Sequence, residues 1–327
     1  MPRPPLILSP IDPPDPRLRR AVVAIGNFDG VHRGHQHVLR RARALAVRLD
    51  APSAALTFEP HPRTFFRPAE PVFRITPQAA KARLLAALGL SGMIVLPFDR
   101  RWASLLAADF VRHLGDGIGV GGLLVGADFR FGAGRQGSVE DLRAAGERYG
   151  FAVEIVDKIG DAERAFSSGR VREALAAGDI AAANAVLGYR WFVAGTVIHG
   201  DARGRELGFP TANIDPGPDF RLRDGIYAVE VRRADGETFA GVANYGRRPT
   251  FGGGAPLLEA HLFRFGGDLY GETLTVSFIG WIRAEERFPS AAALVARMNE
   301  DADRARDLIA AARGGLTELD RDLAAIG

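Results

Sequence analysis

The first half of the chain alternates short apolar runs with segments in which apolar residues return every three or four positions. The apolar runs have the length of buried strands, and they cover residues 21–26, 54–59, 92–97, 122–126 and 151–156. The segments with helical spacing predict a helix that begins near residue 35 and further helices over residues 77–88, 105–114, 139–149 and 171–187. Strands that alternate with helices are typical of a parallel sheet covered by helices, so this half is expected to be a Rossmann-like α/β domain.

After residue 189 the pattern changes to short apolar runs separated by glycine and aspartate turns. These runs cover residues 192–199, 226–232, 239–244, 257–265 and 274–279. Such spacing favours an antiparallel β-barrel. A last helix, predicted over about residues 290–312, has apolar positions that would pack it on the barrel.

The change of pattern places a domain boundary near Gly188 and Tyr189. We therefore expect a first domain over residues 21–188 and a second domain over residues 189–327. Residues 1–20 are rich in proline and have only a short apolar run, so we expect a flexible arm there and not a signal peptide.

Composition narrows the class of protein. The 327 residues are 47% hydrophobic and 25% charged, which is typical of a globular protein with room for two domains. The net charge of 42 − 39 = +3 is too small over this length to indicate nucleic-acid binding. There is no cysteine, which excludes disulfide scaffolds, thiolate zinc sites and cysteine nucleophiles, and no apolar run approaches the ~18 residues that span a bilayer. We expect a cytoplasmic protein, monomeric or weakly oligomeric, that binds neither nucleic acid nor membranes.

Three familiar motifs are excluded by their context. Neither lysine is followed by the serine or threonine that a Walker A loop requires, because Ala82 follows Lys81 and Ile159 follows Lys158. The glycine pattern that ends at Gly122 leads from a predicted helix into a strand, which is the reverse of a dinucleotide-binding turn. No H-E-x-x-H sequence is present, so a metalloprotease is excluded as well.

A glycine- and histidine-rich turn follows the first predicted strand. Its sequence, from Gly26 to His35, is Gly-Asn-Phe-Asp-Gly-Val-His-Arg-Gly-His. Open α/β sheets bind ligands at this place, where a helix N-terminus offers free amides, glycines let the backbone approach a phosphate, and histidines add hydrogen bonds. The turn therefore predicts a triphosphate site, although such a turn can also simply join a strand to a helix.

This turn resembles the H-x-G-H nucleotidyltransferases, and specifically the adenylyltransferase half of the bacterial bifunctional riboflavin kinase/FAD synthetase family. Further matches follow in order, over residues 57–62, 96–99 and 125–132. The resemblance implies that His32 and His35 act on the α-phosphate of ATP. It implies nucleotide-binding roles for Gly26, Asn27, Phe28, Asp29, Gly34, Asp128, Ser167, Ser168, Arg170 and Arg172, and flavin-binding roles for His61 and Pro62. From its sequence alone, the His61 segment is equally consistent with a rigid surface loop.

The second half contains the sequence Gly-Phe-Pro-Thr-Ala-Asn at residues 208–213, after a loop rich in glycine and arginine. The hydroxyl of Thr211 and the carbonyl of Asn213 are hard oxygen ligands that suit Mg²⁺, although Pro-Thr-x-Asn is also a common turn. Further along, Glu259 alternates with apolar residues in a predicted strand, so it faces either solvent or a site.

These segments, together with residues 241–251, 258–262 and 268–271, resemble the riboflavin kinase domain of the same family in order and spacing. The resemblance implies a six-stranded barrel in which Glu259 is the general base that accepts the proton of the ribityl hydroxyl of riboflavin. It implies ATP contacts from Gly200, Arg205, Gly208 and Pro210, flavin contacts from Asn244 and Arg248, and a Mg²⁺ ion at Thr211 and Asn213. The implied reactions convert riboflavin and ATP to FMN, and FMN and ATP to FAD and pyrophosphate.

One segment departs from the family pattern. Where the family has Ser-Ser-Thr-x-x-Arg preceded closely by arginine, this chain has Gly169 in place of the threonine and Ala165 at the arginine position, with Arg164 one place away. Two alternatives therefore stay open: a riboflavin kinase with a weakened or inactive adenylyltransferase domain, and a non-catalytic flavin-binding protein.

Overall fold

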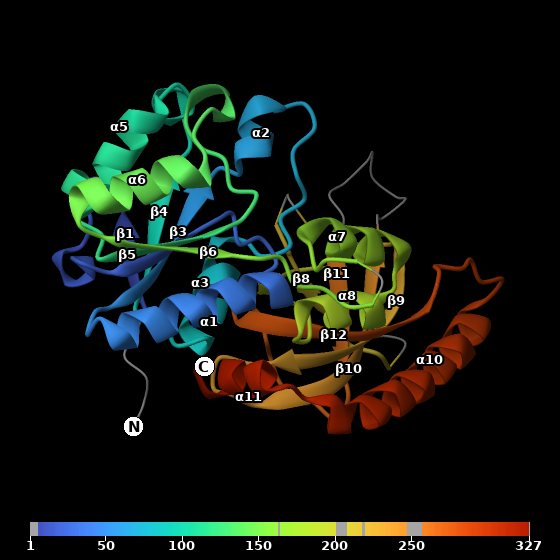
Figure 1. The fold of residues 1–327 in the computed structure, drawn as a ribbon. Helices are drawn as coiled ribbons and strands as arrows, with labels where there is room; N and C mark the ends of the chain where they lie inside the picture. Colours follow the sequence, from blue (N-terminus) through green and yellow to red (C-terminus); the bar gives the residue numbers. More distant parts are fainter. Residues whose placement is uncertain (1–5, 163, 201–207, 218–219, 247–256, 327) are drawn as a thin grey trace. The chain divides into compact units, whose positions relative to one another are not determined.

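The computed structural model describes residues 6–162, 164–200, 208–217, 220–246 and 257–326 (Figure 1). These residues pack into two compact units. The first contains residues 6–72 and 76–167, and the second contains residues 73–75 and 168–325. The chain thus divides after Ser167, ahead of the boundary that the sequence pattern places near Gly188.

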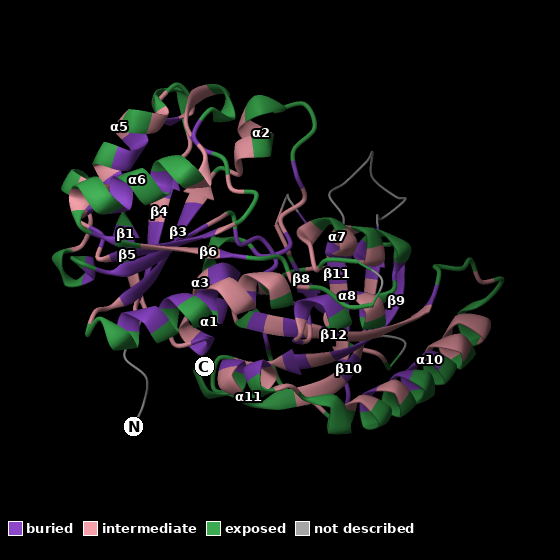
Figure 2. Cartoon of the chain, in the orientation of Figure 1, coloured by how far each residue is buried: buried purple, intermediate pink, exposed green. Residues whose placement is uncertain are grey.

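The first unit is built on a six-stranded parallel sheet with helices on both faces. In spatial order its strands are β1 (Ile7–Pro10), β4 (Gly92–Pro97), β3 (Ser53–Glu59), β2 (Val22–Ile25), β5 (Gly122–Gly126) and β6 (Ala152–Val156). The central strand β2 is buried along its whole length, and Figure 2 shows its sheet neighbours β3 and β4 mostly in the buried colour. A strand covered on both faces must be apolar throughout, which is why these strands appear in the sequence as continuous apolar runs.

The helices divide between the two faces of the sheet. Helices α1 (Arg33–Arg48) and α3 (Gln78–Ala87) lie on one face, while α5 (Ala107–Arg112) and α6 (Val139–Tyr149) lie on the other (Figure 1). Shorter pieces complete the unit. They are α2 (Pro62–Phe66), α4 (Arg100–Ala103), 3₁₀ turns at Pro16–Leu18 and Ala133–Arg135, and a π-helical turn at His113–Ile118.

The expectation of a flexible arm over residues 1–20 is wrong for the described part of that segment. The described part of residues 1–20 includes strand β1, which pairs in parallel with β4 from Ile7 to Pro10, and the side chains of Ile11 and Leu18 are 2% and 1% exposed. Proline is tolerated here because β1 is an edge strand, where an amide is not required for pairing on its outer side. The few apolar residues between the prolines are enough to anchor this segment.

The second unit is a closed antiparallel barrel of six strands. Around the barrel they are β10 (Thr238–Gly246), β11 (Leu257–Leu262), β8 (Ala212–Ile214), β7 (Phe192–Ile198), β12 (Thr273–Arg283) and β9 (Gly225–Arg232). The sequence pattern missed β8 as a strand because it has only three residues. The expected architecture, a Rossmann-like α/β domain followed by an antiparallel barrel and a C-terminal helix, is confirmed.

Aromatic rings fill one end of the barrel interior. Trp191 stacks on Phe220 and Phe278 at centroid distances of 5.5 and 5.1 Å, and Tyr227 meets Phe278 edge-on. On the outer surface, helix α10 (Ala291–Ala312) packs its small buried residues against the barrel strands. A final helix, α11 (Glu318–Ile326), follows it.

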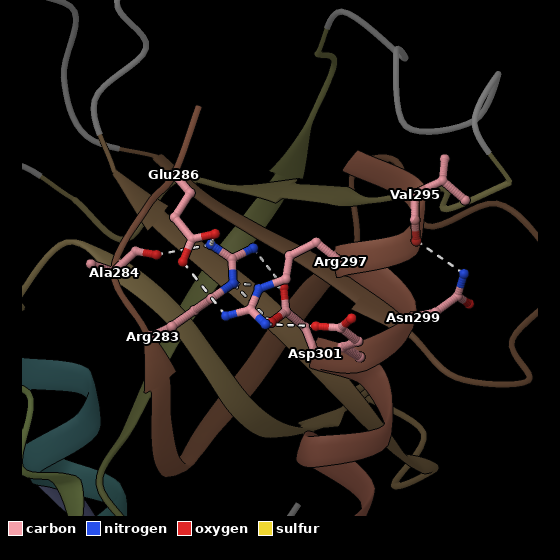
Figure 3. A network of polar contacts seen from close by, with 8 residues as sticks. Arg283, Ala284, Glu286, Val295, Arg297, Asn299 and Asp301 are labelled. Atoms are coloured by element: carbon pink, nitrogen blue, oxygen red, sulfur yellow. Dashed lines mark hydrogen bonds and ion pairs between the residues drawn. The ribbon is translucent and has the colours of Figure 1, made fainter. Parts of the chain in front are cut away.

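A buried ion pair fastens α10 to the barrel. Arg283, at the end of β12, donates through Nε and Nη2 to the carboxylate of Asp301 on α10, with distances of 2.7 to 3.1 Å (Figure 3). The two residues are 8% and 4% exposed. Arg297, also on α10, pairs with Glu286 in the segment that joins the strand to the helix, at 3.5 Å. These contacts fix where α10 lies on the barrel.

Two helices take the place of the single helix predicted over residues 171–187. They are α7 (Ser168–Ala177) and α8 (Ile180–Leu187), and they are separated at Gly178, whose φ of +77° ends the first helix. Asp179 then caps the second helix through the backbone N–H of Ala182. Asn184 on α8 donates to the carbonyl of Phe278 in β12 at 3.1 Å, so these helices group with the barrel. No helix in the described ranges is long and apolar enough to cross a membrane.

Candidate active sites

The Gly26–His35 turn joins β2 to α1 at the carboxyl end of the parallel sheet. His32 is the N-cap of α1, and its Nδ1 accepts a hydrogen bond from the backbone N–H of His35 at 3.4 Å. Because Nδ1 is the acceptor, the proton of a neutral His32 ring lies on Nε2. This nitrogen can donate to an anion at the helix N-terminus, where the free amides also attract negative charge.

The two histidine rings act as one stacked pair. Their centroids are 3.6 Å apart with an interplanar angle of 23°, and Phe28 meets the His35 ring edge-on at 5.3 Å. Burial, followed by the nearby charges of His32 and Lys81, holds the pKa of His35 well below its ordinary value. The Nδ1 atom of His35 is buried and has no hydrogen-bond partner among the described residues. A neutral imidazole with a free nitrogen at a helix N-terminus is suited to hydrogen bonding with a nucleotide.

The shape of the turn is held by a pair of buried polar side chains. Asp29 is 1% exposed, and its carboxylate accepts hydrogen bonds from the backbone N–H of Thr76 at 3.0 Å and from its hydroxyl at 3.3 Å. The Thr76 hydroxyl oxygen in turn accepts from the N–H of Gly30 at 2.7 Å. These hydrogen bonds hold the Asp29 carboxylate inside the turn. Its evident role is therefore to fix the shape of the turn, and not to contact a phosphate.

Two glycines allow this close packing. A Cβ at Gly34 would lie 3.1 Å from the His32 ring, and a Cβ at Gly26 would lie 3.1 Å from the Phe28 ring. Both distances are tighter than ordinary contact. The glycine spacing thus serves the packing of the turn's own rings as well as any approach to a ligand.

Other residues predicted for this site occupy separate loops of the first unit. Asp128 follows β5 and forms an exposed ion pair with Lys158 at 2.8 Å, which lowers the pKa of its carboxyl group. His61 caps α2, because its Nδ1 accepts from the N–H of Arg63 at 3.1 Å, and Pro62 begins that helix. His61 therefore stabilises the start of α2, and its flavin-binding role stays a prediction.

In the barrel, three polar residues form one row across neighbouring strands. Glu259 on β11 is directly opposite Asn213 on β8 and directly opposite Asn244 on β10. Residues opposite one another in a ladder project from the same face. The interior of the barrel takes the alternate positions, since Leu258 and Ala260 are fully buried. Glu259 and both asparagines therefore face outward together.

This row has the features of a ligand site. The side-chain oxygen of Asn244 is buried and has no hydrogen-bond partner in the described part of the chain. Asn213 is 5% exposed, and a Cβ at Gly200 would collide with its side chain, so glycine is required for the β7 end to approach so closely. A carboxylate flanked by two amides, one with an unsatisfied oxygen, can bind a hydroxyl group or a cation.

The segment before β8 is held by His261. Its Nδ1 lies 2.8 Å from the carbonyl oxygen of Pro210, and its ring lies 5.1 Å from that of Phe209. His261 is two residues after Glu259 on the same strand, so it projects from the same face. Thr211, which follows Pro210 and precedes β8, is thereby held next to Asn213 and the Glu259 row.

Comparison with known proteins follows the same division of the chain. A family model for FAD synthetase matches residues 15–170, and one for riboflavin kinase matches residues 187–309. The "Bifunctional riboflavin kinase/FMN adenylyltransferase" of Pseudomonas fluorescens is 44% identical over 90% of this chain and 95% of the relative. The protein of that name from Haemophilus influenzae is 42% identical over 88% of this chain and 94% of the relative. This chain belongs to the bifunctional riboflavin kinase/FMN adenylyltransferase family.

A solved structure extends the likeness to the fold. A crystal structure described as a macrolide-efflux protein from Streptococcus pneumoniae is 30% identical to this chain, with a TM-score of 0.82. The match covers 92% of this chain and 99% of that one. The fold of this family member is thus shared over nearly its whole length.

The remaining residues predicted from the family pattern fall in three places. Ser167 ends the first unit, while Ser168, Arg170 and Arg172 lie in the first turns of α7 and group with the barrel unit. Arg172 donates through Nε to the carbonyl of Phe73 at 2.8 Å. Pro210 and Gly208 immediately precede the β8 row, and Gly208 has a φ of +84°. Arg205 and Arg248 lie outside the described residues.

The polar residues that support the histidine turn are not evident from the sequence pattern. Thr76 lies far along the chain from Asp29, and the local sequence of Lys81 shows only that it is not part of a Walker A loop. The signal that could have found Lys81 is its position in an otherwise apolar helical pattern, where it falls on the same face as Leu84 and Leu85. In a family member with only two lysines, a lysine on the buried face of a helix indicates a specific task.

Proposed function

We propose that the barrel phosphorylates riboflavin with Glu259 as the general base and that the parallel-sheet unit adenylylates FMN with the His32–His35 pair. As a member of its family, the chain is a riboflavin kinase and an FMN adenylyltransferase, with ATP as co-substrate and FMN and FAD as products. The assignment of each reaction to named residues is the proposal. The observation that carries it is the row of Glu259 between Asn213 and Asn244.

In the kinase reaction, Glu259 accepts the proton of the terminal ribityl hydroxyl as that oxygen attacks the γ-phosphate of ATP, and ADP leaves. In this proposal Asn244 accepts a hydrogen bond from the flavin substrate, which is supported by its unsatisfied side-chain oxygen and its position opposite Glu259. This role agrees with the flavin contact implied by the family pattern. Arg248 would add to it from the segment outside the described residues.

A divalent cation fits the same face. Thr211 and Asn213 offer hard oxygen ligands of the kind that Mg²⁺ prefers, and the Asn213 side chain is held by Gly200 and by its place opposite Glu259. When bound, Mg²⁺ would neutralise the charge that develops on the phosphates. Within this proposal, Thr211 and Asn213 hold the metal, while Gly200, Gly208 and Pro210 shape the phosphate-binding segment around it.

In the adenylyltransferase reaction, a phosphate oxygen of FMN attacks the α-phosphate of ATP, and the bond to pyrophosphate breaks. Negative charge grows on the oxygens of the α-phosphate in the transition state. His32 Nε2, one nitrogen of neutral His35 and the free amides of α1 are donors suited to that charge. The stacking of the two rings keeps both donors in a fixed orientation.

The two alternatives are not favoured. A pure flavin-binding protein has no need of a carboxylate between two amides. The relatives that match most of this chain are also named for both activities. A weakened adenylyltransferase would rest on the departures at Gly169 and Ala165, whereas the histidine turn keeps both histidines of the family pattern. We also propose that the enzyme works in the cytoplasm as a monomer or weak oligomer.

The test is a time course with purified protein, riboflavin, ATP and Mg²⁺, in which FMN and FAD are separated by chromatography. We expect FMN to appear first and FAD to follow, and a chelator to stop both. Formation of neither flavin nucleotide would overturn the proposal. Kinase activity that survives complete removal of Mg²⁺ would overturn the role of Thr211 and Asn213 as metal ligands.

A further inference from the structure

Lys81 carries a positive charge into the core of the first unit. It lies on α3 and is 1% exposed. Its Nζ donates to the carbonyl of Asn27 at 2.9 Å and to the hydroxyl of Thr57 at 2.9 Å, and it lies 3.5 Å from a carboxylate oxygen of Glu59. A buried ammonium group is strongly unfavourable unless such partners surround it. Its presence here therefore indicates a task that an apolar residue could not perform.

The contacts of Lys81 converge on one peptide group. The Thr57 hydroxyl also donates to the Asn27 carbonyl, at 3.0 Å, so that oxygen accepts two side-chain hydrogen bonds. Asn27 is the second residue of the histidine turn, just after the end of β2 at Ile25. Lys81 and Thr57 thus fix the direction in which the turn begins.

The turn needs such support because part of its backbone is strained. Phe28 has a φ of +46° and Val31 a φ of +39°, in the left-handed region that non-glycine residues avoid. Such residues persist only where their surroundings hold them, and they cluster at functional sites. Phe28 follows immediately after the peptide that Lys81 holds.

The charge of Lys81 also reaches the histidine pair. It is one of the groups that lower the pKa of His35, after burial of the ring and the neighbouring His32. The partly exposed Glu59 lies beside Lys81 on the side of β3. Removal of the ammonium should therefore raise the pKa of His35.

We propose that Lys81 is a positioning residue for adenylyl transfer, whose ammonium group holds the Asn27 peptide so that the Gly26–His35 turn is directed at the nucleotide phosphates. The inference rests on the proposed adenylyltransferase function of this turn. Lys81 does not itself contact the nucleotide. It acts through the turn backbone and through the charge state of His35.

The first test is Lys81→Met, which keeps the length of the side chain but removes the ammonium. We expect kcat for FAD formation from FMN to fall by about 10²-fold, because a small misplacement of a phosphate-binding group has an effect of that size. FMN formation from riboflavin, measured on the same sample, should change by less than about twofold, since its residues belong to the barrel. Gln78→Met, at an exposed position of the same helix, is the matched control and should change neither activity.

Thr57→Val separates geometry from charge. It removes the hydroxyl that donates to the Asn27 carbonyl and accepts from Lys81 Nζ, but it keeps the ammonium group. We expect a loss of about tenfold in FAD formation, the effect of one hydrogen bond that involves a charged group. The acid limb of the pH–rate profile should move to higher pH in Lys81→Met and stay in place in Thr57→Val. Titration of the His35 ring by NMR should show the same difference.

The parent protein is measured first. A parent that forms no FAD contradicts the proposed function, but the His35 titration in parent and Lys81→Met still tests whether Lys81 controls the charge state of His35. If Lys81→Met forms FAD at the parental rate, the inference is overturned. Equal losses of FMN and FAD formation would overturn it as well. If Lys81→Met does not fold, Thr57→Val decides: a tenfold loss confined to FAD formation supports the positioning role, and an unchanged rate overturns it.

Discussion

The two candidate sites are built in different ways. In the parallel-sheet unit, one contiguous turn supplies backbone amides and two stacked histidines, and buried side chains from distant parts of the chain hold its shape. In the barrel, single side chains from β8, β11 and β10 line up because the strands pair in register. The first site therefore depends on loop geometry, and the second depends on the identity of a few side chains.

This difference sets the expected response to substitution. In the barrel, strand pairing keeps the row in place when one side chain changes, so a substitution there should remove one chemical role and leave the rest. In the turn, the histidine side chains and several backbone amides all donate to the phosphate. The loss of one donor should therefore reduce the rate by a smaller factor.

Glu259→Gln should have the largest effect. Glutamine keeps the size and the strand pairing but cannot accept the proton, so riboflavin phosphorylation should fall by about 10²- to 10⁴-fold. FAD formation from supplied FMN should persist at the parental rate. Steady-state kinetics of both reactions check this, and unchanged kinase turnover would remove Glu259 from the mechanism.

Asp301→Ala tests the support of the barrel and not its chemistry. It leaves the buried charge of Arg283 with only the longer ion pair to Glu286 at 3.9 Å, which should lower the free energy of unfolding of the barrel by about 3 kcal/mol (Figure 3). Kinase activity should then be lost at a lower temperature than adenylyltransferase activity. Denaturant unfolding measures the change, and Asp303→Ala, at an exposed position of the same helix, is the control. Equal stability of the two variants would show that the ion pair does not fasten α10.

His32→Ala should slow FAD formation by about 10²-fold, the usual loss for one donor to a transition-state oxyanion, and leave FMN formation intact. Assays of both reactions in the variant provide the measurement. Equal damage to both activities would mean that His32 serves folding instead of adenylyl transfer.

Gly169→Thr should have the smallest effect, and it should be a gain. A threonine hydroxyl at this exposed position in the first turns of α7 would restore the donor present in the family pattern. We expect the KM for ATP in FAD formation to fall, or kcat to rise, by about tenfold, which corresponds to one hydrogen bond to a charged group. If the variant is no better than the parent, neighbouring donors already fill the role.

The two sites also differed in how well the sequence predicted them. The histidine turn was visible because its residues are contiguous, and the alternation of strands and helices predicted where the turn would lie. Its supports were not visible, since Thr76 and Lys81 meet the turn only after folding. In the barrel, the alternation around Glu259 does not tell whether its side chain faces solvent or a site. Only the register with Asn213 and Asn244 shows that the three residues share one face. Strand register between distant segments cannot be derived from local pattern.

Local pattern also failed where short elements depend on tertiary contacts. Strand β8 has three residues, too few to show alternation, and β1 lies among prolines that usually indicate a loop. Both are stabilised by pairing with a longer neighbour, β11 in one case and β4 in the other. Propensity alone does not predict such segments, because their stability comes from the partner strand.

Riboflavin phosphorylation is assigned here to Glu259 of the barrel and FMN adenylylation to the histidine turn of the parallel-sheet unit. Mixing Glu259→Gln with His32→Ala tests directly whether the two reactions depend on these separate groups. Supplied with riboflavin, ATP and Mg²⁺, the first variant alone should form almost no FMN, and the second alone should accumulate FMN with little FAD. The mixture should form FAD, because FMN released by the intact barrel of one protein reaches the intact histidine turn of the other. A mixture that accumulates FMN and forms no more FAD than His32→Ala alone would contradict the account.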